Sequence, residues 1–266
     1  MTPSIAIIVG SAFDSSFAEK LQLTPQTVRT EYGEMVLFRC GLRTTHPAWV
    51  LPRHGFPHRL LPNHINYRAQ AAALKQVGCK ALLINSSVGV MDASLPIYKP
   101  MLVTDLLMPE NRLPDGSTCT MFPEPGPTQG HLLIKEGLFA PNLRAWLLEE
   151  CADSIHATDE EIVFVYAGGP RGKTPAENRM WAQLGGQVNS MTLAPEVVLA
   201  NELEIPVAAV VVGHKYSVPG VSNPAKESIA DTLTQARQAT EEILVTFLKR
   251  GVPMPFTNQI YRFRDA

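Results

Sequence analysis

The 266-residue chain lacks the signatures of several large protein classes. Its formal net charge is −2 and its basic residues are scattered, so we expect no basic face for nucleic acid. No apolar run reaches about 18 residues, which argues against a membrane span. No basic leader precedes an apolar run at the N-terminus, so no secretory signal is expected. These absences favour a cytoplasmic protein that contacts neither nucleic acid nor a membrane.

Cysteine is scarce, and several motifs of cofactor and metal chemistry are missing. The four cysteines stand far apart, with no CxxC pair and no cysteine–histidine cluster at zinc spacing. We therefore expect buried free thiols in a reducing compartment and no metal site. The P-loop, the dinucleotide-binding glycine fingerprint, HExxH and GxSxG are also absent from the sequence. No cofactor is predicted.

Short apolar strands alternate with amphipathic helices along the chain. The expected strands cover residues 4–9, 48–51, 81–84, 101–107, 161–166 and 207–212. The expected helices cover residues 66–78, 176–184, 195–203 and about 226–250. This alternation predicts an α/β fold in which a mostly parallel or mixed sheet is covered by helices on both faces.

The chain shows no internal repeat and no domain boundary. Two stretches rich in glycine and proline, residues 109–130 and 219–224, are flanked by strand or helix patterns and are expected to be long surface loops. We therefore predict a single domain over residues 1–266, with a C-terminal tail from about residue 251 to residue 266.

Four polar segments follow expected strands. Residues 10–11 form a turn whose N–H groups and hydroxyl can hold an anion. Residues 53–58 place an arginine and two histidines at a strand end, and these are donors suited to phosphate. Residues 85–89 and 189–196 add hydroxyls, although a helix cap and a helix-dipole partner explain part of the last segment equally well. Ligands of open α/β sheets bind outside the carboxyl ends of the strands, so the four segments predict one metal-free phosphate site.

Longer motifs add a resemblance to a known family. These are RHG…H from residue 53, NY from residue 66, GPR from residue 169 and MTxxPEVVLA from residue 191. Together they resemble the methylthioadenosine phosphorylases and, more widely, the trimeric purine nucleoside phosphorylases, in register from about residue 5 to residue 250. The resemblance implies a central mixed sheet with flanking helices, a homotrimer, and phosphate as co-substrate without a cofactor. It implies phosphorolysis, in which phosphate attacks the anomeric carbon of a nucleoside and releases the base and a ribose 1-phosphate.

The resemblance also assigns residues to the phosphate and the sugar. The implied phosphate-binding residues are Ser11, Arg53, His54, Ser86, Ser87 and Thr192. The implied sugar-binding residues are Met191, His58 and His131, and His131 is expected to reach the 5′ end of the nucleoside across a trimer interface.

The base site departs from the family. Gly172 stands where family members usually carry an aromatic residue that stacks on the purine. Lys215 stands where they carry an aspartate or an asparagine that contacts the base, and an ammonium donates hydrogen bonds but cannot accept them. The base set is therefore Gly172, Lys173, His214, Lys215 and Ser217, and it favours a 6-oxopurine over adenine.

These departures leave two further functions open besides a purine nucleoside phosphorylase, with or without a 5′-methylthio group on its substrate. One is a protein on the same scaffold whose widened base pocket binds another aromatic small molecule without turnover. The other is a hydrolase that uses water in place of phosphate. Arg53 and Thr192 argue against the hydrolase, because both are expected to bind an anion. An aromatic side chain that fills the stacking place would favour the enzyme; the candidates are Phe13, Tyr166 and Tyr216.

Overall fold

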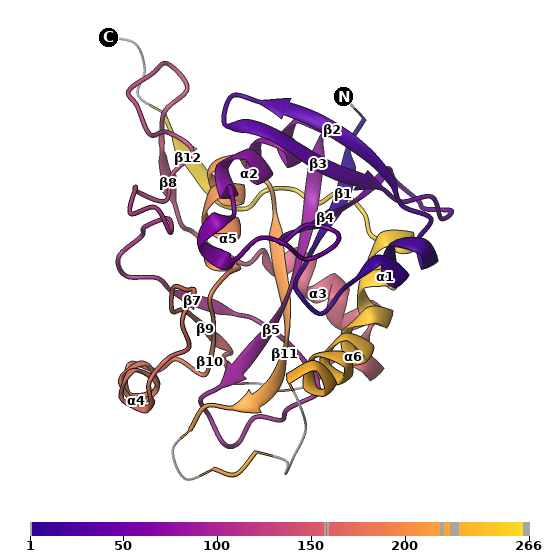
Figure 1. Ribbon diagram of the computed structural model, residues 1–266. Helices are drawn as coiled ribbons and strands as arrows, with labels where there is room; N and C mark the ends of the chain where they lie inside the picture. Colours follow the sequence, from indigo (N-terminus) through magenta and orange to yellow (C-terminus); the bar gives the residue numbers. More distant parts are fainter. Residues whose placement is uncertain (1, 157, 159, 219–220, 224–228, 263–266) are drawn as a thin grey trace.

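A mixed sheet forms the centre of the protein (Figure 1). In the described residues it has ten strands, and its main path runs β2-β3-β4-β1-β5-β10-β9-β7, with β11 paired to β5 and β6 off this path. The strands are β1 (Ser4–Val9), β2 (Thr24–Thr30), β3 (Gly33–Arg39), β4 (Ala48–Pro52), β5 (Cys79–Val90), β6 (Pro100–Leu102), β7 (Asp105–Leu107), β9 (Val163–Tyr166), β10 (Val188–Ser190) and β11 (Val207–Tyr216). The computed structural model describes residues 2–156, 158, 160–218, 221–223 and 229–262.

The parallel strands β4, β1, β5 and β11 lie at the centre of the sheet. All six residues of β1 are buried, as expected for a parallel strand covered on both faces. Alternate side chains of β1 enter different clusters: Ala6 and Ile8 pack with α2 and α5, whereas Ile5 and Ile7 pack with α3 and α6. The predicted mixed sheet with flanking helices is thereby confirmed.

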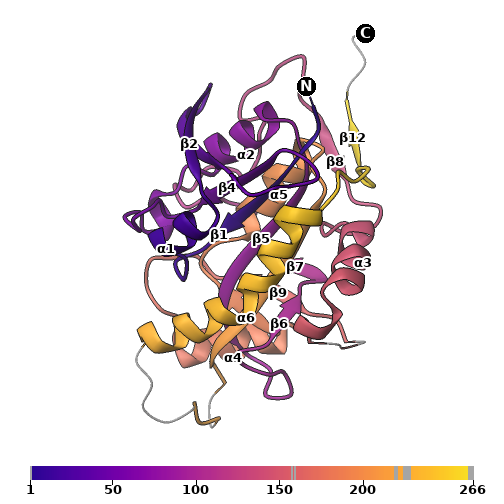
Figure 2. The same ribbon diagram turned by 90° about the vertical axis from the view of Figure 1, so that its right-hand side faces the viewer.

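The helices cover both faces of this sheet (Figure 2). The helices are α1 (Ser15–Lys20), α2 (Tyr67–Gln76), α3 (Pro141–Glu150), α4 (Pro175–Gln183), α5 (Ala194–Glu202) and α6 (Ile229–Arg250), with short 3₁₀ turns at Pro62–His64 and Ala152–Ser154. Helix α2 begins where Asn66 accepts a hydrogen bond from the N–H of Ala69, and Gly78 follows it at φ +74°. Three predicted helices are thus confirmed to within two residues, while residues 226–228 of the fourth lie outside the described residues.

Two predicted strands were too short and one was wrong. Strand β5 continues through residues 85–90 and β11 through residues 213–216, so the polar segment 85–89 lies inside a strand rather than after one. The single strand predicted over residues 101–107 is two strands: β6 pairs antiparallel with β11, and β7 pairs parallel with β9. The break at residues 103–104 lets the chain pass from one partner to the other.

Two features were not predicted. Strands β2 and β3 form an antiparallel hairpin at one edge of the sheet. Strand β12 (Gln259–Tyr261), in the predicted C-terminal tail, pairs with β8 (His131–Leu133) and makes a separate ribbon beside the sheet (Figure 1). No helix among the described residues is both long enough and apolar enough to cross a membrane.

Candidate functional site

The site lies at a gap in the strand pairing along one edge of β5. Strand β1 pairs with this edge as far as Ile84, and β10 pairs with it at Gly89 and Val90. Between these contacts, residues 85–88 have neither strand on that side. A cavity of about 300 Å³ opens there, lined by the end of β1, by β5, by β10 and by β11. Strands that diverge beyond their carboxyl ends commonly create ligand sites in α/β sheets.

Thirteen of the fourteen candidate site residues line this one cavity. They are Ser11, Arg53, His54, His58, Ser86, Ser87, Gly172, Lys173, Met191, Thr192, His214, Lys215 and Ser217. The fourteenth, His131, lies in β8 opposite Tyr261 of β12 and does not line the cavity. Its role across a trimer interface remains a prediction.

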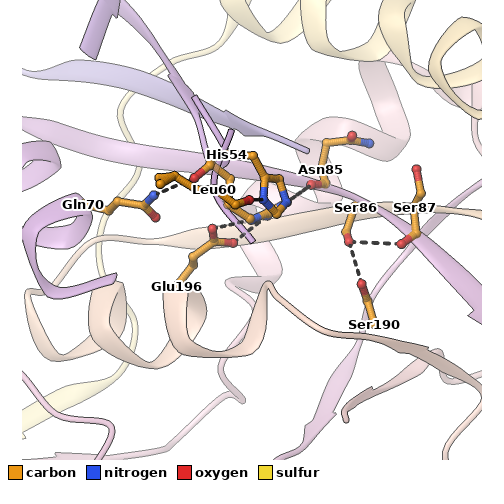
Figure 3. A network of polar contacts seen from close by, with 9 residues as sticks. His54, Leu60, Gln70, Asn85, Ser86, Ser87, Ser190 and Glu196 are labelled. Carbon is orange, nitrogen blue, oxygen red and sulfur yellow. Dashed lines mark hydrogen bonds and ion pairs between the residues drawn. The ribbon is translucent and has the colours of Figure 1, made fainter. Parts of the chain in front are cut away.

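One end of the cavity is rich in hydroxyl groups. Ser86 donates a hydrogen bond to the carbonyl of Ser87 at 3.3 Å, and its Oγ lies 3.4 Å from the Oγ of Ser190 (Figure 3). Ser11 and the buried Thr192 line the same cavity. The site is also closely packed at Gly10, where an added Cβ would lie 3.1 Å from Nη1 of Arg53. These donors make the end a suitable anion corner.

Arg53 enters this corner already paired. Its Nε and Nη2 donate to the carboxylate of Glu196 at 2.5 and 2.6 Å, and Nη1 and Nη2 each donate to the carbonyl of Asn85 at 3.2 Å (Figure 3 shows Glu196 and Asn85). Both side chains of the pair are 1% exposed. Glu196 is therefore more than a helix-dipole partner, and its role as the counter-ion of Arg53 was not predicted from the sequence. A buried arginine at the end of a strand does, however, require such a partner.

His54 is held as a neutral imidazole. Its Nδ1 lies 2.7 Å from the carbonyl of Leu60, and its ring centroid lies 4.4 Å from that of His58 (Figure 3 shows His54 and Leu60). Burial, reinforced by the charge of Arg53, lowers the pKa of His54 to about 4. A carbonyl only accepts hydrogen bonds, so Nδ1 carries the proton and Nε2 keeps a lone pair.

The other end of the cavity is cationic. A register shift between Gly213 and Lys215 against β5 bulges β11 at His214. Lys215 follows the bulge, and Lys173 enters from the loop that precedes α4. Burial and, to a smaller extent, the charge of Lys215 lower the pKa of Lys173 to about 8. Burial also lowers the pKa of His214 to about 4, together with the charges of the two lysines.

No aromatic side chain among the described residues stacks at this end. A Cβ added to Gly172 would meet no atom within 4 Å, so the space beside it is open. Phe13 packs against Phe17 at 4.6 Å, the hydroxyl of Tyr216 donates to the carbonyl of Leu95, and Tyr166 lines a neighbouring cavity. Among the described residues, no three histidine, cysteine, aspartate or glutamate side chains cluster as metal ligands.

The fold and the cavity define an α/β protein with a hydroxyl-rich corner and a separate cationic end at a break in its central sheet. A family model described as the Phosphorylase superfamily matches residues 4–249, and the chain belongs to this family.

Similar proteins include nucleoside phosphorylases of archaea. The chain is 35% identical over 218 residues to a probable S-methyl-5′-thioinosine phosphorylase of Methanopyrus kandleri, covering 80% of this chain and 78% of that protein. It is 28% identical to a 6-oxopurine nucleoside phosphorylase of Pyrococcus furiosus, covering 95% and 93% of the two chains. The structure of methylthioadenosine phosphorylase from Schistosoma mansoni in complex with adenine superposes with a TM-score of 0.76 at 24% identity, covering 92% and 90% of the chains, and shows the same fold.

Proposed function

We propose that the chain cleaves the N-glycosidic bond of a purine nucleoside with phosphate, giving a free base and a ribose 1-phosphate. The observation that carries this proposal is one cavity that brings together a hydroxyl-rich anion corner and a cationic end, with the adjacent strands β5 and β11 contributing to both. A nucleoside placed between them has its anomeric carbon facing the anion. The enzyme is then a pentosyltransferase with phosphate as its co-substrate.

The residues at the anion corner position the nucleophile. Ser11, Ser86, Ser87 and Thr192 offer hydroxyl and backbone donors to phosphate oxygens. As the glycosidic bond breaks, the sugar takes on oxocarbenium character, and an adjacent anion held by fixed donors stabilises it. Met191 lines the cavity and packs on Gly169, where an added Cβ would lie 2.9 Å from its sulfur. This placement suits a residue under the ribose.

The base end favours a 6-oxopurine. Lys173 and Lys215 are hydrogen-bond donors, and no aspartate or glutamate is among the described residues that line the cavity. O6 and N7 of hypoxanthine or guanine accept such bonds, whereas the 6-amino group of adenine opposes them. The names of the Methanopyrus and Pyrococcus relatives, a thioinosine and a 6-oxopurine phosphorylase, support this preference. Their activity also favours turnover over binding alone.

The assembly belongs to the proposal as well. We infer a cytoplasmic homotrimer in which His131 of one subunit approaches the 5′ end of the nucleoside bound by the next. The exposed ribbon of β8 and β12, with Tyr261 half exposed, supports this arrangement. Light scattering tests the trimer. His131→Ala should then raise KM for the 5′-methylthio substrate, while the molar mass of the assembly in light scattering stays that of the trimer.

Base release from a panel of nucleosides tests the activity. The panel contains inosine, guanosine, adenosine and their 5′-methylthio forms, each with and without phosphate. We expect phosphate-dependent release that is faster for the 6-oxopurines. Release without phosphate would indicate the hydrolase, and phosphate binding without release from any nucleoside would indicate a binding protein.

A further inference from the structure

The cationic charge of the cavity is concentrated at the base end rather than in the anion corner. Arg53 is neutralised by Glu196 at 2.5 Å, and His54 is uncharged because burial lowers its pKa. Lys173 and Lys215 line the same cavity, and no carboxylate in the described part of the chain forms an ion pair with either lysine. The nearest carboxylate on the adjoining helix, Glu177, is held by Arg171 at 2.6 Å.

The chemistry of the proposed reaction requires an acid at this end. When the bond between C1′ and N9 breaks, its electron pair remains on the purine, and a purine anion is a poor leaving group. A proton delivered to N7 makes the departing base neutral. The acid must lie at the base end and must carry a proton near neutral pH.

Elimination leaves the two lysines. His214 is uncharged because burial and both lysines lower its pKa to about 4. The hydroxyl of Ser217 is too weak an acid. Asn178 and Asn189 bond each other at 3.1 Å and do not ionise. No carboxylic acid is among the described residues that line the cavity.

Resting on the proposed function, we propose that Lys173 is the general acid that protonates N7 of the departing purine, while Lys215 holds the 6-oxo group. Lys173 is the less exposed of the two lysines, and it enters the cavity from the loop before α4. The neighbouring residue is Gly172, so no aromatic side chain at position 172 fills the space beside Lys173. Lys215 is the more exposed of the two and lies on β11.

The step balances. An oxygen of hydrogen phosphate bonds to C1′ as the bond to N9 breaks, and the electron pair moves onto the purine. Lys173 transfers a proton from its ammonium to N7 and becomes a neutral amine. The sugar phosphate then releases the proton that hydrogen phosphate brought, and the amine takes up a proton from solvent. No metal, oxidant or cofactor enters.

The charged surroundings of Lys173 set the pH at which it loses its proton. Burial has the largest effect on the pKa, Lys215 lowers it further, Glu177 raises it, and the result is about 8. Lys173 lines two neighbouring cavities. The titratable and charged side chains of the first, the candidate site, are Arg53, His54, His58, His214 and Lys215. Those of the second are Glu110, Arg112, Tyr166, Arg171 and Glu177. Phosphorolysis of a 6-oxopurine nucleoside should therefore decline as the pH rises through about 8.

Inosine and 7-methylinosine separate this role from mere binding. The methyl group makes the base of 7-methylinosine cationic before the bond breaks, so no proton at N7 is needed. In Lys173→Met we expect kcat for inosine to fall about 100-fold or more, the usual contribution of a general acid. Cleavage of 7-methylinosine at pH 7 should be at least as fast as in the unaltered protein, because an ammonium that repels the substrate has gone. Lys80→Met, on the exposed start of β5, is the matched control and should change neither rate.

A second variant tests the pH dependence. Lys215→Met should move the alkaline midpoint for inosine upward, because the Lys215 ammonium lowers the pKa of Lys173. An equal loss with both substrates in a Lys173→Met protein that melts like the unaltered one would overturn the proposal. So would full inosine activity in that variant, or an alkaline midpoint that Lys215→Met leaves in place. If the unaltered protein releases base from neither nucleoside, the proposed function itself fails, and this inference fails with it.

Discussion

Arg53 and Glu196 form a bidentate ion pair at the floor of the cavity, with Nε–Oε1 and Nη2–Oε2 distances of 2.5 and 2.6 Å and both side chains 1% exposed. Arg53 follows β4, and Glu196 lies in the first turn of α5, so the pair connects a central strand to the helix that follows Thr192. The positive charge of Arg53 is therefore largely neutralised by Glu196 inside the protein.

Removing one partner of this pair should lower the free energy of unfolding. Arg53→Ala leaves the carboxylate of Glu196 buried and unpaired, a situation that typically costs about 3–5 kcal/mol. We expect the free energy of unfolding, measured in urea at fixed protein concentration, to fall by that amount. The double variant Arg53→Met with Glu196→Leu should recover most of the loss, because no charge is then left buried.

An exposed pair supplies the control. Arg29 and Glu34 bond across the β2–β3 hairpin at 2.9 Å, with side chains 86% and 61% exposed. Arg29→Ala should change the free energy of unfolding by less than about 1 kcal/mol. Equal effects at positions 29 and 53 would show that burial does not make the Arg53 pair special.

The buried His54 and the half-buried His214 should make stability depend on pH. The folded-state pKa of His54 and of His214 is about 4, below the ordinary value of 6.5, because burial disfavours the charged ring. Between pH 6.5 and 4 the unfolded chain therefore binds protons that the folded chain does not, and stability falls as the pH falls. Each histidine contributes a slope of at most about 1.4 kcal/mol per pH unit. His54→Asn should flatten the dependence between pH 7 and 5, whereas substitution of the exposed His64 should not.

The sequence was sufficient to predict the centre of the fold. Strands β1 and β4 and helices α2, α4 and α5 carry strong local signals, such as the fully apolar run of β1 and the caps at Asn66 and Thr174. The β2–β3 hairpin was missed because one residue in each of its strands is buried, so neither shows a clear apolar face. The division of residues 101–107 between two partners is set by the sheet and has no local signal.

The residues that line the site could be predicted from the sequence, but their contacts and arrangement in space could not. Motifs identified thirteen residues that line one cavity, although Ser86, Ser87, His214 and Lys215 lie within strands rather than after them. The pairing of Arg53 with Glu196 requires two segments 143 positions apart to meet, which spacing alone does not reveal. The bulge at His214 is likewise invisible in the sequence, because it arises from the register of β11 against β5.

The charge at position 215 should set the choice of base. Lys215→Asp replaces a donor with an acceptor, so we expect the ratio of kcat/KM for adenosine to that for inosine to rise at least tenfold, equivalent to about 1.4 kcal/mol. Lys80→Asp, outside the cavity, should leave the ratio unchanged. If the ratio in Lys215→Asp equals that of the unaltered protein, Lys215 does not contact the base.

The open space at Gly172 should accept an aromatic ring. A Cβ there meets no atom within 4 Å, and the position is not among the glycines of positive φ, so a larger side chain is compatible with the backbone. In Gly172→Phe the ring can stack on the purine, and aromatic pairs contribute about 0.5–1.5 kcal/mol beyond their buried area. We expect KM for inosine to fall several-fold, with a smaller change in Gly172→Ala, which adds a methyl group but no ring. By contrast, Gly89→Ala should impair binding, because its Cβ would lie 2.4 Å from the Oγ of Ser217. A KM that rises in Gly172→Phe would place the base elsewhere in the cavity, away from the loop before α4.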